Sequence, residues 1–546
     1  MQASARFVVV GAFCLGTSWL GCSGHPPRPA SPTDDTGHHG AAPVHLVISC
    51  SASTQARFDE ALVLLHNMEY LRARERFNAA SEAEPSCAML QWGVAMTYFH
   101  PLWPGEPSAD DVRSGRAAVT KGQAASQAND IERAYLAAVA EFYRGDDTAY
   151  PGRLASWAAA QAKVAEQAPA DVEAQAFSAL AALANVDKQD KAKSRAQREA
   201  IGAKLEALLQ QHPDHPGLMH YLLHAYDFPG LAQHALEVAR RYAASSPDAS
   251  HALHMPGHIY VRLGAWTDVV QSNIDSAAAA QRHPNADGRI SRHYLHAADY
   301  MIYGYLQMGD DEHAREIVAK LAPSSSFELH SGPGAYALAA GPARMALERG
   351  MWKDAAALAP RAVPYDWEDF PWAEAVTYAA RGLGAARAGD PKLAQQQLLE
   401  LERLTPQIKA AWWKGRVEIE HDAIAAWVAH DLGDDKQAEQ LARKASEREL
   451  AAGKDGVEPG HVFYATEVLG DLLLELKRPA DALDAFQATL EDSPQRLDAL
   501  YGAGQAAELA GKPDVAATYY RQLVAISPAS SRPAREHAQQ FLAQHR

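Results

Sequence analysis

A repeated pattern near the C-terminus constrains the fold of this chain more than any other feature. In the segment LGDLLLELKRPADALDAFQATLEDSP, small residues, an aromatic residue and a closing proline occur in an order that recurs in the segment after it. The matching positions are Gly470, Ala482, Phe486 and Pro494 in the first unit and Gly504, Ala516, Tyr520 and Pro528 in the second. Small residues let two helices pack closely, and neither helix can bury its apolar face alone. We therefore expect stacked helical hairpins.

This pattern resembles the tetratricopeptide repeat, whose unit is a helix hairpin of about 34 residues. The frame also fits earlier segments of the chain. Matching alanine, aromatic and proline residues are Ala73, Phe77, Ala80, Pro85, Ala235, Ala239 and Pro247, and alanines that follow a Gly/Asp turn are Ala314, Ala355, Ala394 and Ala438. The resemblance implies an all-α fold, a tetratricopeptide-like α-solenoid of about nine to eleven stacked helical hairpins. The alternative is an irregular helical bundle.

Composition and charge limit the class of function. The 546 residues are 47% hydrophobic, and the formal net charge of −16 argues against a nucleic-acid partner, which would require a basic stripe. We find no P-loop, GxGxxG, GxSxG or HExxH motif. The mature chain divides into an N-terminal helical region at 49–210, a His-rich core at 211–320, helical hairpins at 321–450 and C-terminal repeats at 451–546.

The N-terminal residues predict export. An apolar run, FVVVGAFCLGTSWLG, follows Arg6 and is short for a membrane span. It ends in LGCSG, which resembles a bacterial lipoprotein signal. We therefore expect a signal peptide at 1–21, a lipid on Cys22 and a flexible tether at 22–48. The protein would then be a membrane-anchored lipoprotein that faces the periplasm or the cell surface, and the lipid would be its one contact with the membrane.

Two cysteines, Cys50 and Cys87, remain in the chain after the residues up to Cys22 are processed. An exported protein meets an oxidising compartment, and this predicts a disulfide between the two. The alternative is a pair of buried thiols.

Histidine is concentrated in the middle of the chain, where eleven of the 24 histidines fall between 212 and 296. His220 and His224 in HPGLMHYLLHAYD recur one repeat length later as His254 and His258 in SHALHMPGHIYVRLG. In tetratricopeptide proteins the second, fifth and ninth places of the first helix generally line the concave groove, so the resemblance implies a ladder of side chains along one inner surface. The residues expected in this groove are His220, His224, His251, His254, His258, His296, Asp299 and Tyr303, joined by His66 and His100, which are also separated by one repeat length.

Three kinds of chemistry fit a histidine-lined groove. The rings can hydrogen-bond to tyrosine and aspartate across repeats, they can bind a transition metal such as Zn, Cu or Fe, or one ring can act as a general acid or base. The histidines expected to bind a metal are His220, His224, His254 and His258. No catalytic residue and no certain cofactor follow from these patterns. Solvated imidazoles protonate near pH 6.5, which would make the groove cationic at lower pH.

Two prolines give local predictions within this region. Pro256, inside HALHMPGHIY, predicts a break in the helix between His254 and His258 because proline lacks the backbone N–H. In AYDFPG, we interpret Asp227 as the N-cap of the next helix and Pro229 as a residue of its first turn.

Four segments together resemble a bacterial family of exported tetratricopeptide-repeat proteins that has no established activity. These are SCSASTQARFDEALVLLHNMEY, PSCAMLQWGVAMTYFHPLW, HPGLMHYLLHAYD and SHALHMPGHIYVRLGAW. The resemblance runs from Cys50 to about Pro528 and supports the fold and export without supplying a reaction. Our first hypothesis is a binding or scaffold protein, more a binder than an enzyme, that holds a protein or peptide partner or a ligand in the groove. The second is a transition-metal-binding protein or metalloenzyme that uses the groove histidines.

Overall fold

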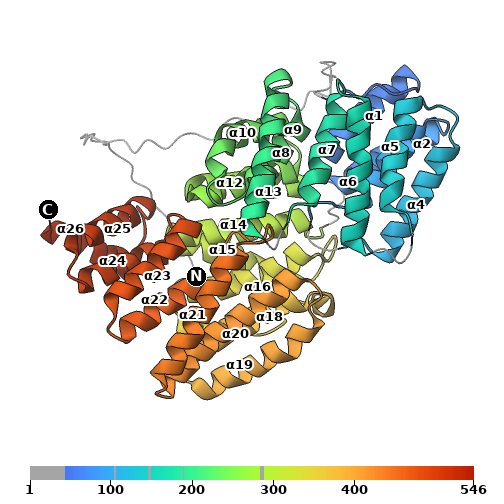
Figure 1. Ribbon diagram of the computed structural model, residues 1–546. Coiled ribbons are helices and arrows are strands. Elements are labelled where there is room, and N and C mark those ends of the chain that lie inside the picture. The colour runs from blue at the N-terminus through green and yellow to red at the C-terminus, as the bar shows by residue number, and fades with distance from the viewer. Residues whose placement is uncertain (1–43, 104–105, 146–148, 188–189, 283–287, 546) are drawn as a thin grey trace, which may run out of the picture. The chain divides into compact units, whose positions relative to one another are not determined.

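The computed structural model describes residues 44–103, 106–145, 149–187, 190–282 and 288–545, and Figure 1 shows it as a ribbon. These residues form α-helices, two short 3₁₀ helices and two isolated β-bridges. The all-α prediction is confirmed. The predicted signal peptide, Cys22 and the tether up to residue 43 lie outside the described residues.

The helices follow one another with short connections. From the N-terminus they are α1 (Ala52–His66), α2 (Tyr70–Ala83), α3 (Ala88–Met96), α4 (Ala109–Ala124), α5 (Asp130–Phe142), α6 (Tyr150–Gln167), α7 (Val172–Ala184), α8 (Lys191–Gln211), α9 (Pro216–Tyr226) and α10 (Ala232–Ser245). The middle of the chain forms α11 (Ser250–His254), α12 (Pro256–Leu263), α13 (Trp266–Arg282), α14 (Arg292–Gln307), α15 (Asp311–Leu321), α16 (Gly332–Leu347), α17 (Trp352–Ala356), η1 (Trp367–Asp369), α18 (Pro371–Arg387), α19 (Pro391–Leu404) and η2 (Thr405–Gln407). The last helices are α20 (Ala411–Asp431), α21 (Asp435–Ala452), α22 (Ala465–Glu475), α23 (Pro479–Asp492), α24 (Leu497–Leu509), α25 (Pro513–Ile526) and α26 (Pro533–Gln544).

Successive helices pair as antiparallel hairpins that stack side by side, as the colour order in Figure 1 shows. With α11 and α12 taken as one interrupted helix, α1 to α25 form twelve hairpins within the described residues. The expectation of nine to eleven was too low because the region at 105–210, which fits the repeat frame poorly by sequence, also folds into regular hairpins. The α-solenoid prediction is confirmed, and the irregular bundle is not.

The C-terminal repeats show why the period requires small residues. The ring of Phe486, on α23, fits between α22 and α24. A Cβ atom at Gly470 would lie 2.7 Å from this ring, and one at Gly502 would lie 2.4 Å from it. Both distances are shorter than van der Waals contact, so a larger residue at either position would push the hairpins apart.

The hydrophobic core has two large clusters. One runs from Val44 to Tyr303, and the other runs from Ala277 to Phe541. Both include residues of α14, so this helix packs on each of them. Alanine is frequent in both clusters, which is consistent with helices that approach closely.

Residues 44–48, assigned by sequence to the tether, pack on the first cluster. They are extended and bury Val44, Leu46 and Ile48. The folded part of the chain therefore begins a few residues before the predicted boundary at residue 49.

Cys50 and Cys87 form a disulfide, as predicted. Cys50 precedes α1 and Cys87 is the N-cap residue of α3, so the bond joins the first hairpin to the second. The alternative of two buried thiols is excluded.

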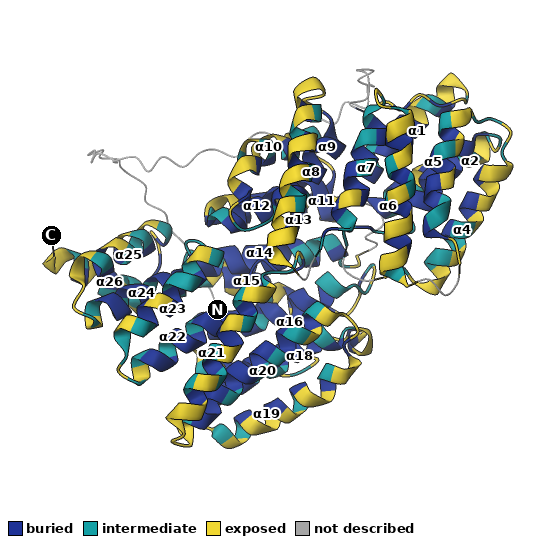
Figure 2. Ribbon diagram, viewed as in Figure 1, coloured by how far each residue is buried: buried dark blue, intermediate teal, exposed yellow. Residues whose placement is uncertain are grey.

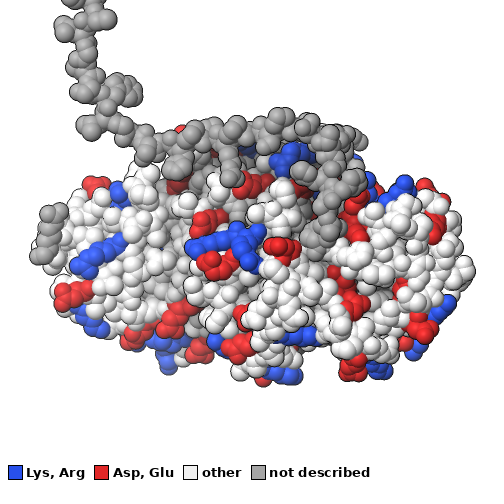
Figure 3. Space-filling model, turned by 90° about the horizontal axis from the view of Figure 1, so that it is seen from above, with Lys and Arg blue, Asp and Glu red and all other residues white. Residues whose placement is uncertain are grey.

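The described helices include none with both the length and the apolar character of a membrane span. On the face drawn in Figure 3, basic and acidic side chains are interspersed, without a large area of one sign.

Replacing both Cys50 and Cys87 by alanine is expected to lower the free energy of unfolding by about 2–4 kcal/mol, because the unfolded chain loses a closed loop. Urea unfolding followed by circular dichroism would measure this change. A reducing agent should destabilise the parent protein and leave the double variant unchanged. Equal stability of the parent and the variant under oxidising conditions would contradict the prediction.

Candidate functional site

Seven histidines from three successive inner helices lie close together. They come from α9, from the broken helix α11–α12 and from α14, which Figure 2 shows largely dark blue. The residues are His220, His224, His251, His254, His258, His293 and His296. Neighbouring rings along this set have centroids between 4.4 and 6.4 Å apart. The sequence repeat therefore brings these side chains close together.

The first histidine cluster consists of His220, His224 and His251. One ring nitrogen from each residue lies within 4.8 Å of the others. His220 Nδ1 donates to the backbone carbonyl of His66 over 2.6 Å, which leaves Nε2 as the atom with a lone pair. The Nε2 atoms of all three residues are buried and have no hydrogen-bond partner in the described chain. Buried polar atoms in folded proteins usually have a hydrogen-bond partner, so these three nitrogens leave room for a water or an ion.

The second histidine cluster consists of His254, His258 and His296, which also bring one ligand atom each within 4.8 Å. His254 Nε2 and His258 Nε2 face each other at 3.0 Å. The amide of Asn273, on α13, donates to the Val269 carbonyl over 2.8 Å, so its oxygen faces His254 Nδ1 at 2.6 Å and accepts a hydrogen bond from that nitrogen.

The partner of His258 fixes its tautomer in the same way. His258 Nδ1 lies 3.0 Å from the carboxylate of Asp227, so this nitrogen carries the proton. The two Nε2 atoms of the second histidine cluster therefore present lone pairs to each other, which is a repulsive arrangement unless a proton or a cation lies between them. His296 adds a buried Nδ1 atom without a partner among the described residues.

Pro256 lies between two histidines of this cluster. The helix breaks at Met255 between α11 and α12, as the proline predicted. Across this break the ring centroids of His254 and His258 lie 4.8 Å apart at an angle of 81°. His220 and His224, on the unbroken helix α9, lie equally close with centroids 4.9 Å apart at 36°, so the two pairs differ in ring angle and not in separation.

A third group, the His66–Glu173 network, differs from both clusters because its atoms satisfy one another. The Glu173 carboxylate accepts from His66 Nε2 over 2.7 Å and from His215 Nε2 over 2.9 Å. His66 Nδ1 accepts from the Tyr221 hydroxyl, and His215 Nδ1 accepts from the backbone N–H of Leu218. This network is structural, and its role is to hold the His66 carbonyl where it receives His220 Nδ1.

Asp227 is a site residue that the sequence interpretation missed. It follows the last residue of α9 as the C-cap instead of serving as the N-cap of α10, which begins after Leu231. Its two carboxylate oxygens accept from Arg262 Nε over 2.8 Å and from His258 Nδ1. The spacing between Asp227 and Arg262, which is close to one repeat length, is the signal that could have linked them.

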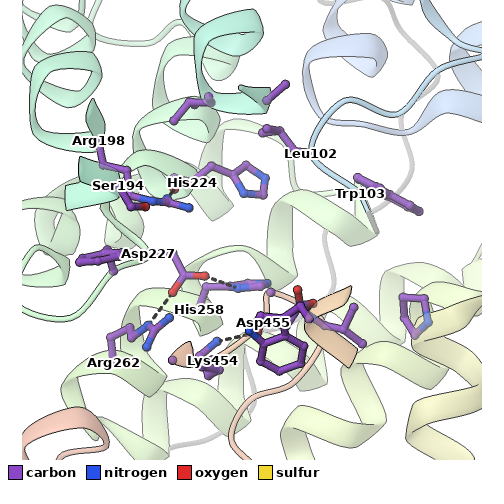
Figure 4. Close-up of a pocket in the computed structure, with 18 of the residues that line it drawn as sticks. Leu102, Trp103, Ser194, Arg198, His224, Asp227, His258, Arg262, Lys454 and Asp455 are labelled. Atoms are coloured by element: carbon purple, nitrogen blue, oxygen red, sulfur yellow. Dashed lines mark hydrogen bonds and ion pairs between the residues drawn. The ribbon is translucent and has the colours of Figure 1, made fainter. Parts of the chain in front are cut away.

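The clusters lie beside a cavity of about 240 Å³. Figure 4 shows His224, Asp227, His258 and Lys454 on its walls. The histidines that line it are His224, His251, His258, His293 and His296. His220 and His254 are not lining residues and lie fully buried behind these walls.

The segment at 453–464, between α21 and α22, closes one side of this cavity. Its Lys454, Asp455 and Val457 line the wall, and Arg344 on α16 donates to the Gly460 carbonyl over 2.6 Å. Glu458 accepts from the Tyr336 hydroxyl over 2.9 Å. No sequence pattern indicated that this C-terminal segment would cover the histidine-rich helices, because local patterns do not encode contacts between segments so far apart in the chain.

Four residues expected in the groove lie elsewhere. The Asp299 carboxylate forms a fully buried ion pair with Arg344, and the Tyr303 hydroxyl lies 3.2 Å from that of Tyr464. His66 belongs to its own network. His100 lies beyond the end of α3, where its ring packs on Tyr70 with centroids 4.4 Å apart. The segment at 453–464 and its neighbours cover the inner face at Asp299 and Tyr303, so neither residue reaches the cavity.

The four histidines expected to bind a metal are divided between the two clusters. His220 and His224 group with His251, whereas His254 and His258 group with His296. The centroids of His224 and His258 are 6.4 Å apart, because neighbouring repeats separate the helix axes. The structure thus divides these four histidines between two three-histidine groups.

Burial lowers the pKa of every histidine in the two clusters. Desolvation is the main cause, and it lowers the pKa of His220 and of His254 to about 3. The pKa values of His224, His251 and His296 fall well below 6.5 for the same reason. The rings therefore stay neutral near pH 6.5, contrary to the expectation for solvated imidazoles, and neutral imidazole is the form that binds metals.

Comparisons with known proteins agree with the repeat fold in part of the chain. A family model described as the tetratricopeptide repeat matches residues 468–531. This segment carries tetratricopeptide repeats. None of the curated proteins compared with the sequence matches it.

Three solved structures are similar, each with a TM-score of 0.29. A tetratricopeptide repeat protein from Parabacteroides merdae is 11% identical over 54% of this chain and 97% of that one. Yeast Tom70 is 14% identical over 90% of this chain and 96% of its own. A chain of the Cut9–Hcn1 hetero-tetramer of APC/C is 12% identical over 91% of this chain and 96% of that one. A fold of stacked hairpins supports a role as a protein-interaction scaffold.

The metal-free protein is expected to lose stability as the pH falls from 7.5 to 5. In the unfolded chain the histidines take up protons below about pH 6.5, whereas His220 and His254 stay neutral when folded until about pH 3. Each such histidine should therefore contribute a loss of roughly 2 kcal/mol at pH 5. Urea unfolding in the presence of EDTA at both pH values would measure this.

Two variants make the pH test specific to the clusters. Replacing His254 by Gln should reduce the difference in stability between the two pH values. Replacing the exposed His234 by Gln should leave it unchanged, because His234 lies outside the clusters. If the parent protein is as stable at pH 5 as at pH 7.5, the prediction is wrong, because the buried rings would then take up protons without a loss of folding stability.

Proposed function

We propose that this protein binds transition-metal ions at its two histidine clusters, beside a cavity that admits a ligand. The observation that carries the proposal is the convergence of three buried Nε2 atoms, from His220, His224 and His251, that have no partner in the described chain. The facing lone pairs of His254 and His258 support a second ion.

The residues present fit a metal in donor type and spacing. Zn–N bonds of about 2.0–2.1 Å place the nitrogens of a tetrahedral site roughly 3.4 Å apart. The ligand atoms of each cluster lie within 4.8 Å of one another, so small rotations of the rings would close either group around an ion. Three imidazoles with a fourth position open to the cavity form the arrangement that catalytic zinc sites use.

The hydrogen bonds around the clusters also fit ligation. A metal-bound histidine usually donates its other ring N–H to a carboxylate or a carbonyl, which fixes the tautomer and orients the ring. The acceptors here are the His66 carbonyl for His220, Asn273 for His254 and Asp227 for His258. Two of these acceptors are themselves anchored, Asp227 by Arg262 and Asn273 through its bond to the Val269 carbonyl.

Imidazole ligands suit Zn²⁺, Cu²⁺ and Fe²⁺ more than Mg²⁺ or Ca²⁺, which prefer oxygen. A bound ion would act as a Lewis acid toward an oxygen atom in the cavity. The chain contributes neutral ligands, a cavity wall and the carboxylate of Asp227 next to His258, and these features serve either a metal carrier or a metalloenzyme.

A second candidate function is a scaffold that holds a protein or peptide partner. The stacking of helical hairpins and the tetratricopeptide repeats at 468–531 favour it. Because the inner histidines are covered by the segment at 453–464, such a partner would bind the exposed faces of the repeats, away from the His-lined groove expected from sequence.

Export and a lipid anchor at Cys22 belong to the same proposal. They are supported by the apolar run before LGCSG and by the Cys50–Cys87 disulfide, which is typical of oxidising compartments. The net charge of −16 supports partners other than nucleic acid.

Protein purified without an affinity tag, stripped with EDTA and titrated with Zn²⁺ or Co²⁺, is expected to take up two ions per chain. Elemental analysis gives the stoichiometry, and the visible absorption of Co²⁺ reports nitrogen ligation. His224→Ala and His258→Ala should each remove one ion, because each deletes a ligand from a different cluster. No uptake of Zn²⁺, Cu²⁺ or Fe²⁺ by the parent would refute the proposal.

Control variants separate loss of a ligand from loss of the fold. His234→Ala, which removes an exposed histidine of α10, should bind as much metal as the parent. Asp227→Asn keeps all six ligands and should weaken binding at the second histidine cluster by about 10–100-fold, as loss of an outer-shell carboxylate does. Circular dichroism would verify that each variant remains helical.

A further inference from the structure

The cavity beside the histidine clusters concentrates positive charge in an acidic protein. Five cationic side chains and two carboxylates line it, while the whole chain carries a formal charge of −16. The cations are Lys191, Arg198, Arg262, Arg292 and Lys454, and the carboxylates are Asp227 and Asp455. Such an excess of one sign in a cavity favours a ligand of the opposite sign.

Arg292, the first residue of α14, is one of the cations that face the cavity. It is 8% exposed and lines the cavity. Its guanidinium lies over the ring of Trp103 at 4.3 Å, and no hydrogen bond or ion pair to it is found within the described part of the chain. Burial lowers the pKa of Arg292, although the carboxylates of Glu69 and Glu328 act in the opposite direction. A buried charge without a direct partner is costly, because solvation is lost without a compensating interaction.

Lys454 presents a second positive charge, from the segment at 453–464. Its ammonium donates to the Glu458 carbonyl over 3.0 Å, and no carboxylate lies within ion-pair distance of it among the described residues. Arg262 differs from these two residues because Asp227 already neutralises it. Arg292 and Lys454 therefore line the cavity without a carboxylate at ion-pair distance among the described residues, and both can receive an anion.

Apolar side chains make up much of the remaining wall. Trp103, Phe228, Pro333, Trp412 and Val457 belong to it. Trp103 also packs against His251, with centroids 5.5 Å apart, and so connects Arg292 to the first histidine cluster. At about 240 Å³ the cavity is smaller than the roughly 300–1,000 Å³ of sites for drug-sized ligands.

We infer that this cavity binds a small organic oxyanion, whose carboxylate or phosphate group pairs with Arg292 or Lys454 and whose apolar body packs against the aromatic part of the wall. A guanidinium matches either oxyanion with two parallel hydrogen bonds. The inferred site rests on charge and shape, and it does not require a metal in the histidine clusters. If a metal is also bound there, the oxyanion would lie within the same cavity.

The test uses the full chain in EDTA, so that metal binding does not contribute. Benzoate and phenyl phosphate serve as the two oxyanions, and benzyl alcohol serves as a neutral compound of similar size. Isothermal titration calorimetry measures each affinity. At least one of the two anions should bind one per chain and at least tenfold more tightly than benzyl alcohol, and the preferred anion distinguishes a carboxylate ligand from a phosphate.

Variants assign the binding to the two cations. Arg292→Met keeps much of the length of the side chain and should weaken binding of the preferred anion by roughly tenfold or more, as expected for a lost charge-assisted hydrogen bond. Arg282→Met, which removes an exposed arginine of α13, should bind as the parent does. Lys454→Met, in a half-buried position, repeats the test if Arg292→Met does not fold.

Three results would overturn the inference. These are no binding of either anion, equal binding of benzyl alcohol, or unchanged affinity in whichever of the Arg292→Met and Lys454→Met variants is folded. If the protein binds an anion in EDTA and takes up no metal when metal is added, this inference stands and the proposed metal sites are refuted. The two proposals can therefore fail separately.

Discussion

The close packing of helices within each hairpin is the constraint on which the rest of the structure depends. Phe486 fits between Gly470 and Gly502 with no space for a Cβ atom at either position. Contacts of this kind fix the distance between repeats, and stacking then places equivalent positions of successive first helices on one inner surface. The histidines of α9, α11–α12 and α14 come together as a consequence of that regular stacking.

Each nitrogen of these buried rings needs a hydrogen-bond partner, and only some of the nitrogens have one. In the His66–Glu173 network every ring nitrogen is bonded, so the group stabilises the interior without a ligand. In the first histidine cluster the three Nε2 atoms have no partner in the described chain. The contrast between two neighbouring groups is the physical basis for treating one as structural and the other as a binding site.

The segment at 453–464 changes the character of the inner surface. It forms one wall of a partly open cavity and brings Lys454 next to residues from much earlier in the chain. Burial lowers the pKa of the histidines by desolvation, keeps them neutral and strengthens charge interactions at the cavity wall. The neutral rings favour metal binding, and Arg292, which has no direct carboxylate partner, favours an anion, so one cavity can hold both.

The sequence by itself determined the repeat architecture, the Cys50–Cys87 pair and the recurrence of His220 and His224 as His254 and His258. The repeats and the histidines follow from local periodicity, and the disulfide follows from the expected oxidising compartment. It did not determine how the rings group, since His251 and His296 join different clusters only after the repeats stack. It misassigned Asp227, and it placed Asp299 and Tyr303 in the groove. The tertiary structure decided these points because they depend on contacts between distant segments, namely Asp227 with Arg262 and Arg344 with Asp299 and Gly460.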